Sequence, residues 1–406
     1  MQPKSSERAP KPAHVPEELV RDVDFFEIIH GEEDAQTAWR RLQLEMPPVF
    51  WTPRNGGHWM VTRAEDIATV QLDHERFSMR QTVLPPAPSM FPSMIHMDPP
   101  DHAPYRRVIM PAFLPRAVAA LEEKARVIAR DLAAGLEPRG ECEFIGEFAK
   151  VLPIVIFLSM VDLPQQDRER LLEIAEAQVH GRTREQRARA ERDMSAYLKS
   201  YITARKSKPG DDLISTVVNA EVNGAPIGED EAYGTCLLLL FGGLDTVASM
   251  LGFVAHFLAS HPEHRKRLLN EPSIIPKAVE ELIRRFGLSN TARLVQSDFD
   301  FHGAPFRKGD FVQQPNVLFA LDETINKDPL EVDFDRENPR HLTFGSGPHT
   351  CPGAVLARRE VKVFLEEWLP RIPDFRITPG TKPVILTGMV NAVRELHLSW
   401  TPSKAA

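Results

Sequence analysis

The sequence predicts a mainly helical fold with a minor β lobe. Apolar residues recur at intervals of three and four along most of the 406 residues, whereas strand-like stretches are short. One apolar segment, residues 236–259, is long enough to run as a helix through the middle of a large domain. The sequence has no repeats and no low-complexity linker, so we expect one domain over residues 1–406, whose first 18 residues form a polar, flexible lead-in.

The strands of the minor lobe are predicted in two places. Residues 49–52 and 58–62 flank Arg54-Asn55-Gly56-Gly57, a sequence typical of a hairpin turn. Residues 299–306 and 311–314 have the alternation and the aromatic content of a second small sheet.

Helical periodicity is clear in several segments outside the central one. Each repeats apolar residues at spacings of three and four, which places them on one face of a helix. The segments are 116–136, 166–177, 183–206, 274–286 and 352–369.

Composition excludes several classes of protein. With 42% hydrophobic and 26% charged residues the chain resembles ordinary soluble globular proteins, and its net charge of −8 argues against a nucleic-acid partner. The cysteines Cys142, Cys236 and Cys351 are odd in number and far apart, so neither a disulfide framework nor a zinc site is supported. The N-terminus has no apolar stretch of the kind that signal peptides carry. We therefore expect a cytoplasmic protein.

The apolar segment 236–259 has two interpretations. Its 24 residues would span about 36 Å as a helix, enough to cross a bilayer. However, Asp245 lies near its centre, where an acidic side chain costs about 2.5–3.5 kcal/mol on insertion scales. We therefore predict a buried core helix.

Four residues inside this segment need a physical reason, because glycine and a buried acid both destabilise a helix. A structural reason would be a kink at Gly242-Gly243, with the Thr246 hydroxyl bonded to the backbone. A functional reason would use all four: the glycines let a flat cofactor approach, while Asp245 and Thr246 together carry protons.

The sequence Phe344-Gly-Ser-Gly-Pro-His-Thr-Cys-Pro-Gly353 is the most informative in the chain. Pro352 suits the first position of a helix, which would make Cys351 the N-cap and lower the pKa of its thiol through the helix dipole. The glycines of this loop, Gly345, Gly347 and Gly353, would let a flat cofactor lie close to the backbone. The alternative is an ordinary buried cysteine beside a glycine turn.

The pattern F-x-x-G-x-H-x-C-x-G resembles the haem-ligand loop of the cytochrome P450 monooxygenases. The resemblance implies a haem b cofactor with Cys351 as the axial ligand of the iron, His349 as a propionate partner and Phe344 packed over the sulfur. The stretch G-G-L-D-T resembles the oxygen-activating part of the family's central helix. It implies that Gly242 makes room for the haem and that Asp245 and Thr246 deliver protons.

Other motifs of the family recur in the same order. Glu281 and Arg284 form an E-x-x-R motif, which alone would usually be a solvated surface pair; in the family it is structural and meets a later arginine, for which Arg336 is the candidate. The run M-D-P-P-D-H-x-x-x-R resembles the propionate-binding helix. It adds further candidates for the haem propionates, namely His102, Arg106 and Arg293.

The match extends to the camphor-hydroxylase branch of the family, but the substrate does not transfer. Met90 stands where the camphor enzyme has a hydrogen-bonding tyrosine, so Ser93 or His96 would have to replace that donor. The alternative for residues 83–97 is a surface loop with core methionines. An apolar pocket with few donors would suit a compact terpenoid or norisoprenoid, such as an ionone-like ketone. Further pocket candidates by resemblance are Leu238, Phe241, Met389 and Val390.

Dioxygen cleavage needs electrons from outside, because the chain has no flavin or dinucleotide fingerprint. A [2Fe-2S] ferredoxin with its reductase is the expected donor, steered to a basic patch. The alternative is a surface cluster of cations without a partner. The patch would consist of Arg106, Arg107, Arg358, Arg359 and Lys362.

Two other haem-dependent functions are the alternatives to a monooxygenase. A peroxygenase would use hydrogen peroxide directly, and such enzymes typically lack the pair formed by Asp245 and Thr246. A haem sensor or ligand carrier would need neither a proton relay nor an electron donor.

Overall fold

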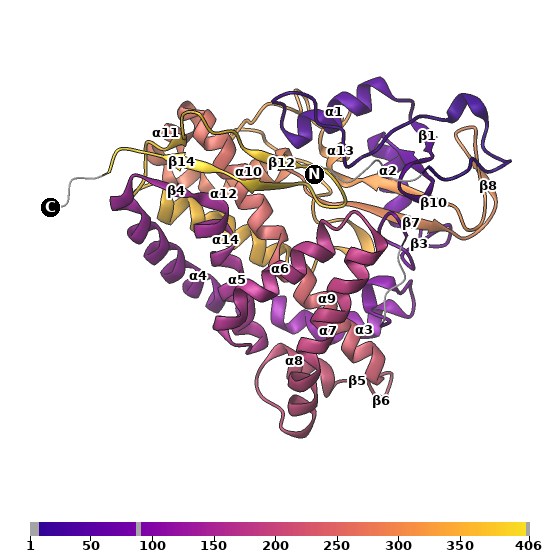
Figure 1. The fold of residues 1–406 in the computed structure, drawn as a ribbon, viewed down its shortest axis with the longest axis horizontal. Helices are drawn as coiled ribbons and strands as arrows, with labels where there is room; N and C mark the ends of the chain where they lie inside the picture. Colours follow the sequence, from indigo (N-terminus) through magenta and orange to yellow (C-terminus); the bar gives the residue numbers. More distant parts are fainter. Residues whose placement is uncertain (1–7, 87–90, 403–406) are drawn as a thin grey trace.

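The computed structural model describes residues 8–86 and 91–402. Its α-helices are α1 (Ala35–Glu45), α2 (Ala64–Leu72), α3 (His102–Ile109), α4 (Pro115–Leu136), α5 (Val151–Val161), α6 (Arg168–Val179), α7 (Arg184–Ser207), α8 (Leu213–Val218), α9 (Glu229–Leu244), α10 (Thr246–Ser260), α11 (Pro262–Asn270), α12 (Ile275–Arg285), α13 (Asn316–Ala320) and α14 (Ala354–Trp368). Its strands are β1 (Val49–Thr52), β2 (His58–Val61), β3 (Phe77–Ser78), β4 (Glu141–Glu143), β5 (Glu221–Val222), β6 (Ala225–Pro226), β7 (Asn290–Val295), β8 (Phe299–Phe301), β9 (Ala304–Phe306), β10 (Phe311–Pro315), β11 (Arg376–Ile377), β12 (Val384–Leu386), β13 (Ala392–Glu395) and β14 (His397–Ser399). The prediction of a mainly helical fold with a minor β component is confirmed, and Figure 1 shows helices filling most of the molecule.

The helices predicted from periodicity are present with their ends shifted by at most two residues. Helix α7 begins where it does because Thr183 caps it. The Thr183 hydroxyl accepts a hydrogen bond from the Gln186 backbone N–H, and the Gln186 side chain accepts one from Thr183, both at 3.2 Å. This reciprocal pair satisfies two donors that the helix cannot satisfy itself.

The largest sheet joins segments that are far apart in the sequence. Its strand order is β1-β2-β10-β7-β3, with β10 parallel to β2 and antiparallel to β7. In Figure 1 the early strands and β7 and β10 accordingly lie side by side. The hairpin of β1 and β2 is therefore as predicted, whereas residues 311–314 do not pair with 299–306. That segment forms its own hairpin, β8 and β9, and β10 joins the larger sheet.

The N-terminal lead-in, expected to be flexible, makes defined contacts from residue 9 onward. The Ala9 backbone N–H donates to the Pro53 carbonyl at 2.9 Å, and Val15 is only 1% exposed. The His14 ring lies 2.9 Å from the carboxylate of Asp310, just before β10. The sequence did not predict these contacts, because the lead-in has few apolar residues and most of its contacts use backbone and polar groups.

The central apolar segment forms two helices instead of one. Helix α9 ends at Leu244, Asp245 leaves helical geometry with φ −121° and ψ −32°, and α10 begins at Thr246. The stretch Glu229–Ser260 is apolar enough to cross a membrane, but 67% of its most apolar window is buried inside the protein. It is therefore a core element, as predicted.

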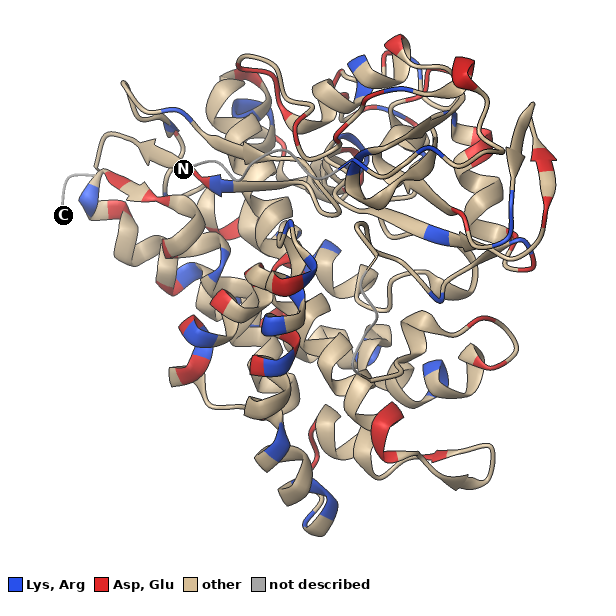
Figure 2. Ribbon diagram, turned by 45° about the vertical axis from the view of Figure 1, so that its right-hand side comes forward, with Lys and Arg blue, Asp and Glu red and all other residues tan. Residues whose placement is uncertain are grey.

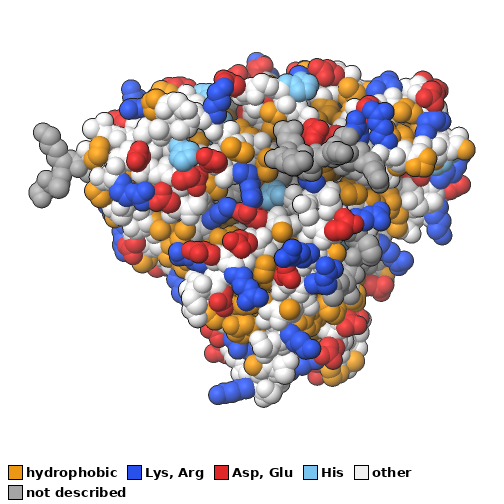
Figure 3. Space-filling model, viewed as in Figure 1, with side chains coloured by type: hydrophobic (Ala, Val, Ile, Leu, Met, Phe, Trp, Pro, Cys, Tyr) orange, Lys and Arg blue, Asp and Glu red, His pale blue; other side chains and the backbone are white. Residues whose placement is uncertain are grey.

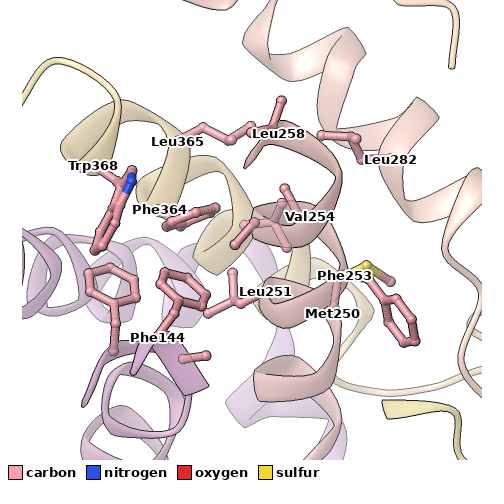
Figure 4. Packing of buried hydrophobic residues seen from close by; sticks show 14 of the residues in the cluster. Phe144, Met250, Leu251, Phe253, Val254, Leu258, Leu282, Phe364, Leu365 and Trp368 are labelled. Atoms are coloured by element: carbon pink, nitrogen blue, oxygen red, sulfur yellow. The ribbon is translucent and has the colours of Figure 1, made fainter. Parts of the chain in front are cut away.

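The core packs around α10. Leu251 and Val254 of α10 lie beside Phe364 of α14, and Phe144 packs against Phe364 and Trp368 with ring centroids 5.4 and 5.1 Å apart (Figure 4). Each such side chain stabilises the fold by about 1.5–3 kcal/mol when fully buried. This packing fixes α14, and hence the loop before it, relative to the central helix.

Candidate active site

A cavity of about 370 Å³ lies between the central helices and the cysteine-bearing loop. Gly242 and Thr246 line it from α9 and α10, Phe344 and Cys351 line it from the loop, and Arg293 lines it from β7. Motifs that are separated by about a hundred residues in the sequence therefore meet at one cavity.

The loop before α14 presents the sulfur of Cys351 to this cavity. Gly345 and Gly347 adopt left-handed φ angles of 69° and 67°, which favour glycine. The Cys351 backbone N–H donates to the Phe344 carbonyl at 2.8 Å and closes the loop. The exposed surface of Cys351 is surface of the cavity it lines.

The prediction that Cys351 caps the helix is wrong. Helix α14 begins at Ala354 with Gly353 as its N-cap, because the Cys351 carbonyl accepts from the Ala354 N–H at 3.3 Å in a turn that precedes the helix. The N–H groups of Gly353 and Ala354 nevertheless still act on the sulfur. The N-cap of α14 therefore lies two residues after Cys351, and the N–H groups at this end of the helix still act on the thiol.

The pKa of the Cys351 thiol is also not lowered as predicted. Burial raises this pKa, and the N–H groups of Gly353 and Ala354 and the charges of Arg106 and Arg358 offset only part of the effect. A thiol with this environment suits a metal ion, because a coordinated metal deprotonates the sulfur itself.

Arg293 and His349 line the cavity without an ion pair to a carboxylate in the described part of the chain. Burial lowers the pKa of Arg293 to about 9, and among the described residues its guanidinium donates only to the Thr291 hydroxyl at 3.1 Å and the Ala292 carbonyl at 2.8 Å. Burial, together with the charges of His102 and Arg293, lowers the pKa of His349 to about 3. The Nε2 atom of His349 is buried and has no hydrogen-bond partner among the described residues.

The remaining predicted propionate residues lie beside these two. The rings of His102 and His349 stack with centroids 4.0 Å apart, and both line the cavity. Arg106 also lines it and donates to the Thr350 carbonyl in the cysteine loop. Four side chains that carry or can carry positive charge at one edge of a cavity fit the two carboxylates of a haem, which would satisfy the orphaned donors.

Asp245 and Thr246 point in different directions. Thr246 lines the cavity and donates its hydroxyl to the Gly242 carbonyl at 3.1 Å, the local bond expected of a helical threonine. Asp245 is not among the cavity-lining residues that the structure describes. Its carboxylate lies 2.6 Å from the Nε2 atom of His180, a residue that sequence reasoning missed. No signal in the sequence links the two, since they are 65 residues apart.

The environment of Asp245 keeps it ionised. Burial raises the pKa of this carboxyl, but the hydrogen bond and charge of His180 and the charges of Arg394 and Lys150 outweigh burial, so the pKa is lowered. An ionised carboxylate only accepts hydrogen bonds, so the Nε2–H group of His180 is the donor.

Gly242 and Gly243 make room for different neighbours. A Cβ added to Gly242 would meet nothing within 4 Å, because this residue faces the cavity. A Cβ added to Gly243 would lie 2.4 Å from the ring of Phe157. Gly353 also lines the cavity, where an added Cβ would lie 3.8 Å from the Cys351 sulfur.

The substrate candidates are only partly placed at the cavity. Leu238 and Val390 line it, whereas Phe241 and Met389 do not. Ser93 and His96 also lie outside the lining and interact with each other at 3.3 Å, and Met90 lies outside the described residues. The donors predicted to replace the tyrosine therefore do not reach the cavity. Sequence reasoning missed many further apolar lining residues, among them Met79, Met94, Ile95, Phe157 and Leu288.

The E-x-x-R residues are buried and paired. Arg284 donates to both carboxylate oxygens of Glu281 at 2.7 and 2.8 Å, and Arg336 donates to the same carboxylate at 3.1 Å. Arg284 also donates to the Pro329 and Glu331 carbonyls. The alternative of a solvated surface pair is excluded, because Glu281 and Arg284 are at most 1% exposed. The cluster ties α12 to the segment before the cysteine loop.

The predicted basic patch is largely neutralised. Arg358 pairs with Glu280, while Arg359 and Lys362 both pair with Glu122. Basic and acidic segments lie next to one another along the helices in Figure 2, and Figure 3 shows both signs interspersed over one face of the molecule. Of the predicted patch, Arg107 is the exposed cation of α3.

Comparison with known proteins agrees with this geometry. Residues 156–389 match the family model described as "Cytochrome P450". The chain is 35% identical to a probable cytochrome P450 127A1 of Sinorhizobium fredii, over 96% of this chain and 97% of that protein. It is 32% identical to the mycinamicin IV hydroxylase/epoxidase of Micromonospora griseorubida, over 92% and 98%.

Solved structures give the same result. The crystal structure of CYP101J2 superposes with a TM-score of 0.88 at 37% identity, covering 97% of this chain and all of that one. That of CYP101C1 gives 0.85 at 39%, with the same coverage. The predicted resemblance to the camphor-hydroxylase branch is thus confirmed. The chain belongs to the cytochrome P450 family, as a monooxygenase of the bacterial type that binds haem through a cysteine thiolate.

Proposed function

We propose that this cytochrome P450 hydroxylates a small apolar terpenoid or norisoprenoid, of the size and shape of an ionone. The observation that carries the proposal is the apolar wall of the cavity, formed by Met94, Phe157, Leu238, Leu288 and Val390. Because the predicted donors Ser93 and His96 lie outside this wall, the substrate is held by shape and apolar contact.

Haem would be held from two sides. Cys351 would provide the ligand to iron, and Arg293, His349, His102 and Arg106 would bind the propionates, which would supply the carboxylates that these side chains lack. The thiolate-bound haem supplies the chemistry that splits dioxygen and inserts one oxygen atom into a C–H bond. Gly242 leaves the cavity open on the side of α9, where an added Cβ would meet nothing within 4 Å.

Proton delivery is the part of the reaction that the chain itself carries out. The Thr246 hydroxyl lines the cavity and can pass a proton to a group bound there. Asp245, adjacent in sequence and buried beside His180, supplies that hydroxyl from the other side of the helix break.

Electrons would come from a [2Fe-2S] ferredoxin and its reductase in the cytoplasm. Arg107 is exposed on the helix that carries the propionate residues His102 and Arg106, which makes it the steering cation we expect to matter. Because Arg358, Arg359 and Lys362 are already paired, charge steering is weaker than the sequence alone predicts.

The substrate class is tested by titrating the purified haem protein with a panel of compact terpenoids, with β-ionone and camphor as probes. A substrate that fits the cavity should shift the Soret band of the bound haem, so β-ionone should give a saturable shift. A panel in which no cyclic terpenoid shifts the band would contradict the proposed substrate.

The reaction type is tested with a bound probe. Turnover with NADH, ferredoxin reductase and ferredoxin should exceed turnover with hydrogen peroxide alone, because Asp245 and Thr246 serve oxygen-dependent chemistry. Turnover with peroxide but none with the ferredoxin system would identify a peroxygenase, and no turnover in either assay would identify a ligand carrier.

A further inference from the structure

A network of side-chain hydrogen bonds lines part of the cavity beside the cysteine loop. The Ser346 hydroxyl donates to Gln71 Oε1 at 2.8 Å, and Gln71 Nε2 donates to Asn316 Oδ1 at 2.7 Å. Asn316 Nδ2 donates to the Ser289 hydroxyl at 3.1 Å, and that hydroxyl donates to the Thr343 carbonyl at 3.3 Å. All five residues of this polar network line the cavity. The network begins at Ser346 and returns to Thr343, so both of its ends lie in the segment just before the cysteine.

Every hydrogen bond in the polar network runs in the same direction. Turning over the amide of Gln71 or Asn316 alone would set two like groups against each other. Turning over both would take the Ser289 hydroxyl away from the Thr343 carbonyl. Aligned hydrogen bonds polarise and strengthen one another, and Gln71 and Asn316 are only 8% and 4% exposed. Removing one partner would therefore leave a buried polar atom unsatisfied.

The polar network ties the cysteine loop to elements from distant parts of the sequence. Gln71 lies in α2, Ser289 lies directly before β7, and Asn316 is the first residue of α13. These elements pack together (Figure 1), and β7 pairs with β10, which leads directly into α13. The loop is thereby held against the largest sheet.

The stretch of the loop that receives this bond is the one with the least restraint of its own. Ser346 lies between Gly345 and Gly347, both with left-handed φ angles, and glycine leaves the backbone free to adopt other conformations. The Ser346 hydroxyl is the side-chain group in this stretch that can fix it. Leu72, next to Gln71 in α2, adds a packing contact, because a Cβ on Gly347 would lie 3.1 Å from its Cδ2 atom.

We propose that Gln71 is a positioning residue that holds the cysteine loop so that the sulfur of Cys351 stays in place for the haem iron. It acts through Ser346 and not on the iron. Without this bond the stretch between the two glycines moves more freely, and the iron loses its sulfur ligand more readily. The inference rests on the haem-thiolate site and not on the proposed substrate.

The decisive comparison is between Ser346→Ala and Ser346→Thr. Alanine removes the hydroxyl that donates to Gln71, whereas threonine keeps it, and the extended backbone of Ser346, with φ −145° and ψ 169°, suits threonine. In the carbon monoxide complex of the ferrous protein, the position of the Soret band shows whether the cysteine thiolate is bound to the iron. Each protein is incubated at a fixed interval below its own unfolding midpoint, so that differences in global stability cancel.

The share of molecules without the thiolate ligand is the measured quantity. It should rise at least threefold in Ser346→Ala, because losing a hydrogen bond shifts an equilibrium by about this factor or more. In Ser346→Thr it should stay within twofold of wild type.

Gln71→Leu removes the same bond from its other end. Leucine is close to glutamine in size but neither donates nor accepts, so the share without the thiolate ligand should again rise at least threefold. In the double variant with Ser346→Ala the share should stay within twofold of that in Gln71→Leu, because the second change finds the bond already broken. Two independent effects would multiply instead.

Gln43→Leu is the matched control, because it makes the same change at another buried glutamine. Gln43, in α1, is 1% exposed and donates to the Thr62 carbonyl at 2.6 Å, and it is not among the cavity-lining residues that the structure describes. This variant should lower the unfolding midpoint but keep the share without the thiolate ligand within twofold of wild type.

Three results would each overturn the proposal. The first is a Ser346→Ala protein that keeps its thiolate ligand as well as wild type, or a Ser346→Thr protein that loses it as readily as Ser346→Ala. The second is a multiplied effect in the double variant. The third is a Gln43→Leu protein that loses the ligand as readily as Gln71→Leu, since the effect would then belong to any buried glutamine.

Discussion

At the scale of single residues, burial sets the charge state of the groups around the cavity. It lowers the pKa of His349 to about 3 and that of Arg293 to about 9, and it raises the pKa of the Cys351 thiol. These shifts all disfavour the charged forms that the proposed haem site requires. In that site the propionates and the iron would supply the opposite charges, so the side chains and the cofactor would stabilise one another.

Glu360, on α14, lets this effect be measured as stability. This side chain lines the cavity and is 2% exposed, and burial raises its pKa to about 8. In an unfolded chain a glutamate has a pKa of about 4.3, the ordinary value for this side chain. Between these values the folded protein binds more protons than the unfolded chain, so the free energy of unfolding falls as pH rises.

Replacing Glu360 with glutamine removes this pH-dependent loss in the free energy of unfolding. We expect Glu360→Gln to melt at a higher temperature than wild type at pH 8 and to differ little at pH 5, where the wild-type carboxyl is protonated in the fold. Thermal unfolding of the haem-bound proteins at the two pH values measures this. An equal difference in melting temperature at both would contradict it.

At the scale of secondary-structure elements, the two glycines of α9 have separate tasks. Gly243→Ala would place a methyl group 2.4 Å from the Phe157 ring, so we expect a loss of about 1–3 kcal/mol in the free energy of unfolding. Gly242→Ala is the matched control, since its methyl group would meet nothing within 4 Å. Urea denaturation checks both, and Phe157→Leu should restore most of the stability of Gly243→Ala. A Gly243→Ala protein as stable as wild type would contradict this expectation. It would show that α5, which carries Phe157, shifts to accommodate the methyl group without loss of stability.

Local sequence patterns predicted where the helices lie, but they did not predict where a helix is interrupted. The periodicity of residues 183–206 marks α7, whose start is set locally by Thr183. The apolar run 236–259 instead predicts one helix, whereas the chain breaks at Asp245. Asp245 bonds to His180, and Gly243 fits against Phe157, and both partners come from distant parts of the chain.

At the scale of the whole molecule, ion pairs determine how an electron donor meets this protein. Because Arg359 is neutralised by Glu122 while Arg107 is exposed, Arg107→Ala should slow reduction by ferredoxin several-fold and Arg359→Ala much less. Stopped-flow reduction at two salt concentrations measures both effects. A larger effect from Arg359→Ala would mean that its pair with Glu122 opens when ferredoxin binds.

The sequence by itself determined the helical class and the family, and it supplied the residues that we propose act in the reaction. Helix periodicity and the loop motif depend only on residues close together in the sequence. Short sequence patterns were therefore enough to identify Cys351, His349 and Thr246 as candidates. The tertiary structure decided which groups surround them. It placed His180 beside Asp245, neutralised Arg358, Arg359 and Lys362, and kept Ser93 and His96 out of the cavity, because burial and pairing depend on residues that meet only when the chain folds.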